Sequence, residues 1–129
     1  MKDYQRKKNN KYILPNAVYM QTVWIIRDYP RMKEEAQAIL EESPPPPDGQ
    51  PRGTGKGDDV FSKAARREDL LRKTKAIEYA LGTVPKEYRF GVWLNVIERR
   101  AFPRDAGRST YGKWKSRFVF EVAVRLGII

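Results

Sequence analysis

Apolar residues recur at every third or fourth position through most of the chain, and this spacing predicts helices. The first such stripe lies between residues 16 and 42, behind Pro15 and Asn16, which suit the entry to a helix. Pro30 interrupts the stripe. Because a proline inside a helix removes one hydrogen bond and crowds the preceding turn, we expect a kink or a break near Tyr29. The stripe consists of Val18, Tyr19, Thr22, Val23, Ile25, Ile26, Tyr29 and Met32.

Three further helices are predicted in the second half of the chain, over residues 58–81, 85–99 and 109–126. Pro85 suits the first turn of its helix, where the missing N–H is not needed. Gly82 and Gly127 follow two of these helices, at the position where a left-handed residue often ends a helix. Since no segment alternates polar and apolar residues, we predict an all-α helical bundle. The apolar edges of the first two helices consist of Leu70, Thr74, Ile77 and Leu81, and of Tyr88, Val92, Trp93, Val96 and Ile97.

Residues 43–59, SPPPPDGQPRGTGKGDD, hold five prolines and four glycines and no large apolar side chain. Such a segment cannot bury surface, so we interpret it as a linker between an N-terminal arm and helix (1–42) and a C-terminal domain (60–129). The stretch GTGKGD within it suggests a phosphate-binding loop. However, the motif G-x-x-x-x-G-K-[ST] requires glycine where the chain has Gln50 and Ser or Thr where it has Gly57, so we expect no nucleotide site there.

The chain contains neither cysteine nor histidine, which excludes a disulfide framework and a zinc site and removes the thiol nucleophile and the commonest general base. We therefore expect no cofactor and no enzymatic activity. A magnesium-dependent nuclease built only from carboxylates stays an alternative, although we interpret the paired acids Glu34–Glu35, Glu41–Glu42 and Asp58–Asp59 as solvated helix flanks. Without an apolar run of about 18 residues or a signal peptide, we expect a cytoplasmic protein that does not enter a membrane.

The formal net charge is +10, and the charge is clustered. Residues 1–11 hold five basic side chains against one acid, and residues 99–117 hold seven against Asp105, whereas residues 27–42 are acidic. Clustered positive charge favours a nucleic acid as partner over mere solubility, with a solvated basic surface as the alternative. The basic residues of the N-terminal arm, Lys2, Arg6, Lys7, Lys8 and Lys11, form either a phosphate clamp or a disordered tail.

The helix predicted at 109–126 has two faces, as a wheel at 100° per residue shows. We expect one face to pack into the core rather than to stack on bases: Tyr111, Trp114, Phe118, Val122 and Leu126. We expect the other face to point outward: Ser109, Thr110, Lys113, Ser116 and Arg117. Short hydroxyl side chains followed by basic ones suit the second helix of a helix-turn-helix, which lies in the major groove of DNA. Gly112 weakens this helix but would permit close approach to DNA.

Two stretches, AIEYALGTVPKEYRFGVW (76–93) and FPRDAGRSTYGKWKSRFVFEVAVRLGI (102–128), resemble the RinA-like group of phage and prophage transcriptional regulators, whose C-terminal half is similar to region 4 of sigma factors. The opening stretch KYILPNAVYMQTVWIIRDYPRMKEEAQAIL (11–40) is also similar to that group. The resemblance implies activation of phage genes through double-stranded promoter DNA and the host RNA polymerase. It places the DNA-reading positions at Ser109, Thr110, Lys113, Ser116 and Arg117. Arg104 and Arg108 complete the predicted DNA-binding set.

The alternative function is a protein-interaction adaptor that docks on RNA polymerase or a phage partner without reading bases. Phe120 and Val124, which the wheel places outward, would form its apolar contact. The oligomeric state stays open, a homo-oligomer included. So does the question whether the N-terminal helix packs on its own chain or on a neighbour.

Overall fold

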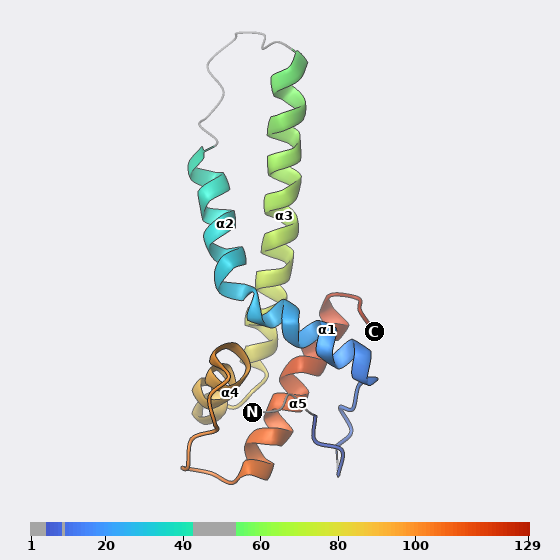
Figure 1. The fold of residues 1–129 in the computed structure, drawn as a ribbon, viewed down its shortest axis with the longest axis vertical. Helices are drawn as coiled ribbons and strands as arrows, with labels where there is room; N and C mark the ends of the chain where they lie inside the picture. The colour runs from blue at the N-terminus through green and yellow to red at the C-terminus, as the bar shows by residue number, and fades with distance from the viewer. Residues whose placement is uncertain (1–4, 9, 43–53) are drawn as a thin grey trace.

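The computed structural model describes residues 5–8, 10–42 and 54–129, and for residues 54–59 only the backbone. Throughout this part of the chain all regular structure is helical, which confirms the all-α prediction (Figure 1). The helices are α1 (Asn16–Arg27), α2 (Tyr29–Glu42), α3 (Thr54–Gly82), α4 (Lys86–Glu98) and α5 (Arg108–Arg125).

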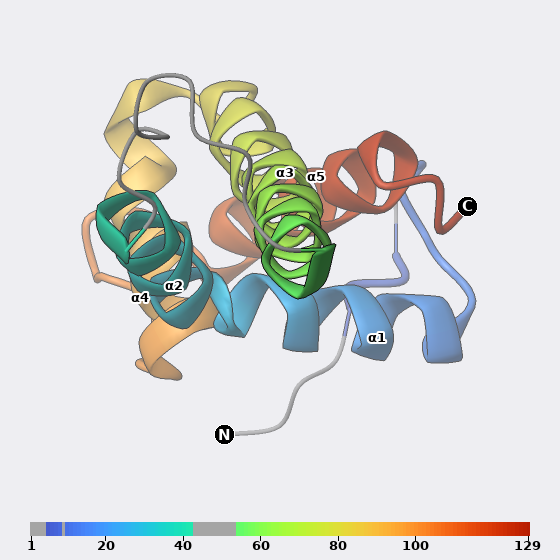
Figure 2. The same ribbon diagram turned by 90° about the horizontal axis from the view of Figure 1, so that it is seen from above.

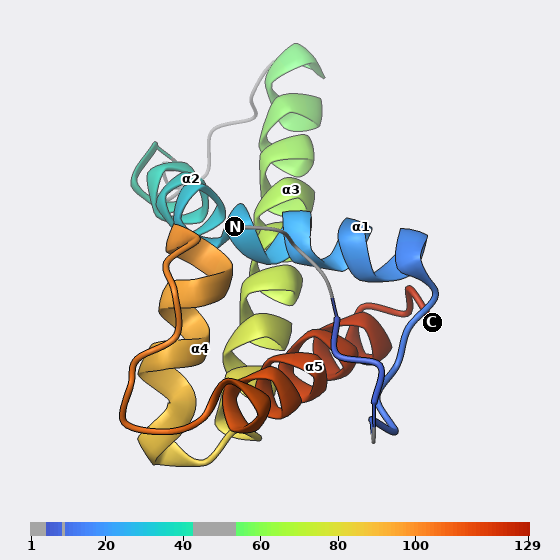
Figure 3. The same ribbon diagram turned by 60° about the horizontal axis from the view of Figure 1, so that its bottom comes forward.

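Two regions are visible in the molecule. α2 lies along α3, and these two helices form a hairpin whose open end projects from the rest of the molecule (Figures 1 and 2). α3 also contacts α4 and α5, and α1 contacts the same two helices, so that these four helices surround the main core (Figure 3). That core is fully buried and consists of Val23, Ile26, Ile77, Ala80, Val84, Val92, Val96, Phe118, Val119, Val122 and Ala123.

The break expected near Tyr29 is present between α1 and α2. Asp28 separates the two helices, and Pro30 is the second residue of α2, where no backbone N–H is required. The Asp28 carboxylate accepts two hydrogen bonds from the Arg31 guanidinium, at 2.7 and 2.6 Å. The helix therefore breaks before Pro30. The bonds between Arg31 and Asp28 join the first turn of α2 to the residue that precedes it.

α3 differs from the prediction at both ends. It begins at Thr54, inside the segment expected to be a linker, whose residues 43–53 lie outside the described part. Gly82 is the last residue of α3 but does not adopt the expected left-handed conformation, which Gly127 does adopt at φ 70°. The reason is a cap from the next helix, since Arg89 donates hydrogen bonds to the carbonyls of Gly82 (3.0 Å) and Val84 (2.7 Å).

An aromatic cluster joins α4, the connection 99–107 and α5. The Tyr111 ring stacks on Phe102 at 5.2 Å and meets Tyr88 edge-on at 5.4 Å, and its hydroxyl donates a hydrogen bond to Asp105 at 2.6 Å. Tyr88 also stacks on Trp114, at 6.4 Å. The prediction that the aromatic residues of α5 pack into the core is confirmed for Tyr111 and for Phe118, which are buried, while Trp114 is half-buried.

The N-terminal helix packs on its own chain. α1 contacts both α4 and α5, and its inner face consists of Tyr19, Thr22, Val23 and Ile26. The segment expected as a separate N-terminal element therefore shares one core with the C-terminal helices. None of the helices in the described part is both long and apolar enough to cross a membrane.

Candidate functional site

The start of α5 and the loop before it carry exposed basic side chains. Arg104, Arg108 and Lys113 are exposed, and none of them forms an ion pair with any residue that the structure describes. Asp105 is the acid nearest to them in sequence, and its carboxylate accepts the Tyr111 hydrogen bond. This part of the surface is therefore positively charged and not neutralised by its own chain.

Basic residues of the hairpin are placed differently. Most of them face an acid at ion-pair distance, and Glu35 contacts basic residues of both α2 and α3. The ion pairs are Arg31–Asp28, Arg31–Glu35, Lys33–Glu78, Arg66–Glu35, Arg72–Asp69 and Lys73–Asp69. Most positive charges of the hairpin are thus neutralised by acids of the same chain, whereas those of Arg104, Arg108 and Lys113, at the other end of the molecule, are not.

The predicted outward face of α5 is only partly exposed. Ser109 and Lys113 are exposed and Thr110 is half-buried, so these three lie where the wheel placed them. Ser116 is wrong as an outward residue, because only 2% of it is exposed, and its neighbour Lys115 is buried as well. The physical reason is that α1, α3 and α4 all contact α5. These three helices bury more of its circumference than its apolar residues alone occupy.

Arg117 lies between two aromatic rings. Its guanidinium is 5.7 Å from the centre of the Tyr12 ring and 6.0 Å from that of Trp114. Its Nε is buried and has no hydrogen-bond partner in the described part of the chain. Arg117 is thus half-buried and held by cation–π contacts rather than extended into solvent.

The segment before α1 is folded back on itself. We call residues 5–8 and 10–14 the N-terminal loop. The buried Gln5 side chain donates a hydrogen bond to the Leu14 carbonyl (2.5 Å) and accepts one from the Leu14 N–H (2.9 Å). Asn10 donates to the Arg6 carbonyl (2.5 Å) and accepts from the Tyr12 N–H (2.9 Å). All four hydrogen bonds join residues of the N-terminal loop to one another.

The N-terminal loop lies against the outward face of α5 (blue and red in Figures 1 and 3). The Tyr12 ring meets Phe120 edge-on at 5.4 Å, and the Arg6 side chain passes over Gly112. The two basic segments of the sequence, about a hundred residues apart, are therefore neighbours. The sequence analysis did not predict this contact; the signal for it is Tyr12, an aromatic side chain within a basic segment.

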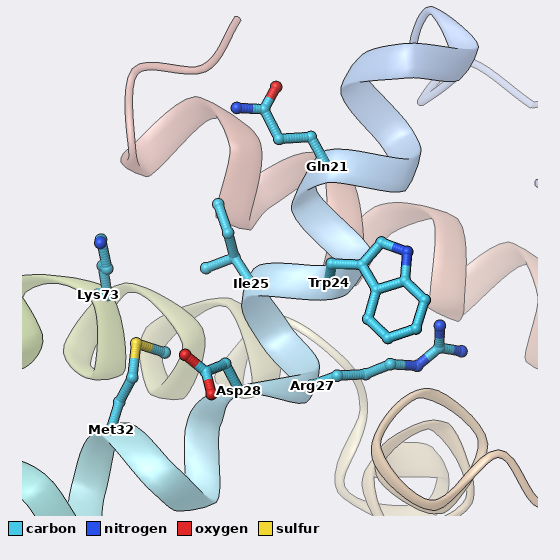
Figure 4. Close-up of a pocket in the computed structure, with 7 residues that line it drawn as sticks. All are labelled: Gln21, Trp24, Ile25, Arg27, Asp28, Met32 and Lys73. Carbon is cyan, nitrogen blue, oxygen red and sulfur yellow. The ribbon is translucent and has the colours of Figure 1, made fainter.

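A shallow hollow lies elsewhere on the surface, where residues of α1, α2 and α3 meet. Figure 4 shows its lining, with Trp24 and Arg27 on one side and Met32 and Lys73 on the other. Its one carboxylate, Asp28, is bound by Arg31, and hydrogen bonds from that guanidinium lower the pKa of the carboxyl group. In the described residues no cluster of acidic side chains could hold a metal ion.

No protein-family model matches the chain, and neither a curated protein nor a solved structure shows significant similarity to it.

Proposed function

We propose that this protein is a DNA-binding transcriptional regulator of the phage type, with α4, the connection 99–107 and α5 acting as a helix-turn-helix. The observation that carries the proposal is that Arg104, Arg108 and Lys113 are exposed and that no acid of the described chain forms an ion pair with them. Exposed cations without an acidic partner suit the phosphates of a nucleic acid. Cations in ion pairs, as on the hairpin, would first have to leave their partners.

α5 would be the recognition helix. Its first two turns carry Arg108, Ser109, Thr110 and Lys113. Its second half contains the buried core residues Phe118, Val119, Val122 and Ala123. Hydroxyl and basic side chains at the start of a helix can reach phosphates and base edges when that end enters the major groove. The aromatic cluster around Tyr111 would hold this end of α5 at a fixed angle to α4.

A role in activating phage genes beside the host RNA polymerase rests on the sequence alone. The stretches 76–93 and 102–128 resemble RinA-like regulators with a part similar to sigma factor region 4. The second stretch contains the loop and the helix that carry the exposed cations. This overlap favours DNA as the partner over another polyanion.

The test is selection of bound duplexes from a random DNA pool, followed by affinity measurements on the selected sequence. We expect a motif to emerge, and we expect Arg108→Gln with Lys113→Gln to lower the affinity at least about tenfold, since each lost arginine contact to DNA costs about 1–3 kcal/mol. The control is Lys33→Gln with Arg72→Gln, which removes two charges from the hairpin and should change little. Failure to select any motif would refute a sequence-specific regulator.

A second candidate is the adaptor function, which one observation favours. Leu40, Val60 and Phe61 are exposed near the open end of the hairpin, and 79% of Phe61 is accessible. Of the two residues expected to form the apolar contact, Phe120 packs on Tyr12, whereas Val124 is exposed as expected. Binding of purified RNA polymerase core without DNA, lost in Phe61→Asp but kept in Arg108→Gln with Lys113→Gln, would support this candidate.

A further inference from the structure

We infer that the N-terminal loop is a second DNA-binding element, which binds backbone phosphates beside the groove that α5 enters and restricts base contacts to the first two turns of that helix. This inference rests on the proposed function. It assigns separate tasks to the two basic segments: Arg108–Lys113 on α5 reads bases, while Lys7, Lys8 and Lys11 hold the phosphate backbone.

The N-terminal loop is built to keep one shape. The amide of Gln5 satisfies both backbone groups of Leu14, and Leu14 itself is buried in the core. A glutamine amide has both a donor and an acceptor, so it can bond the N–H and the C=O of one residue, as a neighbouring β-strand would. These two bonds join the ends of the loop. The cations between these two residues are consequently presented on a defined surface rather than on a mobile tail.

These cations have no acidic partner in the described chain. Lys7, Lys8 and Lys11 are exposed, and Arg6 donates only to the carbonyl of Lys8, at 3.0 Å. A small hollow lined by Asn10, Lys11, Tyr12 and Lys113 marks where the N-terminal loop meets α5. Lys11 of the loop thus lies beside the depression that Lys113 of α5 also borders, so a phosphate bound by Lys11 would lie next to the end of α5 that reads bases.

The position of the loop also determines which part of α5 is accessible. Arg6 passes over Gly112, and Tyr12 covers Phe120 and Arg117, so two turns of the outward face are occupied by the protein itself. Gly112 therefore faces an arginine side chain of its own chain. In the first two turns of α5, the side chains of Arg108, Ser109 and Lys113 stay exposed for contact with the bases, and a short readout of this kind needs added affinity from phosphates.

The experiment uses the full chain and the duplex selected above. In Lys7→Gln/Lys8→Gln/Lys11→Gln, we expect the log–log dependence of affinity on salt to become less steep by about 2 to 3, at about 0.9 for each lost phosphate contact. The selected base motif should stay the same. The matched control, Lys33→Gln/Arg72→Gln/Lys75→Gln, removes three charges from α2 and α3 and should keep the steep slope. Lys7→Arg/Lys8→Arg/Lys11→Arg, which keeps the three positive charges, should also keep the steep slope.

The outcomes separate the inference from the function on which it rests. If Arg108→Gln with Lys113→Gln weakens binding while the loop variant keeps the wild-type slope, the loop makes no phosphate contact and the inference is overturned, with the regulator function intact. A change of selected motif in the loop variant would overturn it too, because the loop would then read bases. A wild-type protein that selects no motif refutes the proposed function instead. Circular dichroism of each variant confirms that it is folded.

Discussion

Gly91 sits on α4 at the point where α5 and the connection 99–107 approach most closely. A Cβ atom at this position would lie 2.5 Å from a ring carbon of Tyr111 and 2.7 Å from a ring carbon of Pro103. Neither a packed aromatic ring nor a proline can move away easily. The absence of a side chain at Gly91 is therefore what allows the aromatic cluster to form.

Gly91→Ala should lower the free energy of unfolding by about 1–3 kcal/mol, because it overpacks this contact. Gly82→Ala is the matched control: a Cβ there meets nothing within 4 Å and the residue has no positive φ, so alanine should be neutral or stabilising by up to about 1 kcal/mol. Urea unfolding of both variants measures the difference. Equal stability of the two would mean that α4 and α5 are not in close contact at Gly91.

Tyr111 provides a pH-dependent contribution to stability. Burial, followed by the hydrogen bond donated to Asp105, raises the pKa of Tyr111 to about 12. In the unfolded chain the same phenol ionises near its ordinary pKa of about 10. Between these two values the folded state binds more protons than the unfolded state, so the contribution is complete below pH 10 and is lost as the pH rises to about 12.

A titration of tyrosinate absorbance should therefore show a late step, which Tyr111→Phe diminishes. The remaining amplitude of the late step should come from Tyr29, whose pKa is also raised by burial and by its hydrogen bond to Glu78. Tyr111→Phe should also cost about 1.5–3 kcal/mol at neutral pH, because one hydrogen bond to a carboxylate is lost. If the late step kept its full amplitude and only the step near pH 10 became smaller, Tyr111 would be open to solvent.

Helix α4 is followed by an arginine in a backbone conformation that is unusual for this residue type. Arg99 has φ 56° and ψ 34°, the left-handed conformation that glycine normally takes after a helix. The buried Asn95 donates a hydrogen bond to the Arg100 carbonyl at 2.8 Å and so stabilises the turn. The Arg99 guanidinium lies 4.8 Å from the centre of the Trp24 ring, which is also contacted by Arg27.

Replacing Arg99 separates backbone strain from the cation–π contact. Arg99→Ala and Arg99→Gly both lose the contact with Trp24, but glycine alone relieves the left-handed strain, so the glycine variant should be more stable than the alanine variant by about 1 kcal/mol. Thermal or urea unfolding of the two proteins gives this difference directly. If alanine were as stable as glycine, the turn after α4 would not be left-handed in solution.

The helices could be predicted from local patterns, whereas their ends and exposed faces depended on other elements. Pro30 gave the break between α1 and α2 correctly because its effect lies within one turn. Gly82 was assigned a left-handed cap that Arg89 makes unnecessary, and that arginine belongs to the next helix. Ser116 was placed outward because the wheel records polarity, not the number of helices that pack around α5.

For the molecule as a whole, the sequence predicted two basic clusters but not that they meet. The contact depends on pairs such as Tyr12 with Phe120, which are separated by about a hundred residues and leave no local pattern. The outward face predicted for α5 was consequently too long, because Ser116 is buried, and its contact with the N-terminal loop was not predicted. Charge clustering was visible in the sequence, and in the described residues the N-terminal loop and the start of α5 carry exposed cations, whereas most basic residues of the hairpin form ion pairs.

This distribution of charge predicts how stability responds to salt. The unpaired cations of the N-terminal loop and α5 repel one another, and about 0.2 M salt screens this repulsion, while it also weakens the exposed ion pairs of the hairpin, each worth at most about 1 kcal/mol. With a net charge of +10, relief of repulsion should dominate, so Tm should rise between about 20 mM and about 200 mM NaCl. The rise should be smaller in Lys7→Gln/Lys8→Gln/Lys11→Gln than in wild type, because three of the repelling charges are gone. A Tm that falls with salt would mean that the hairpin ion pairs outweigh the basic surface, and that the two clusters are farther apart in solution than the fold places them.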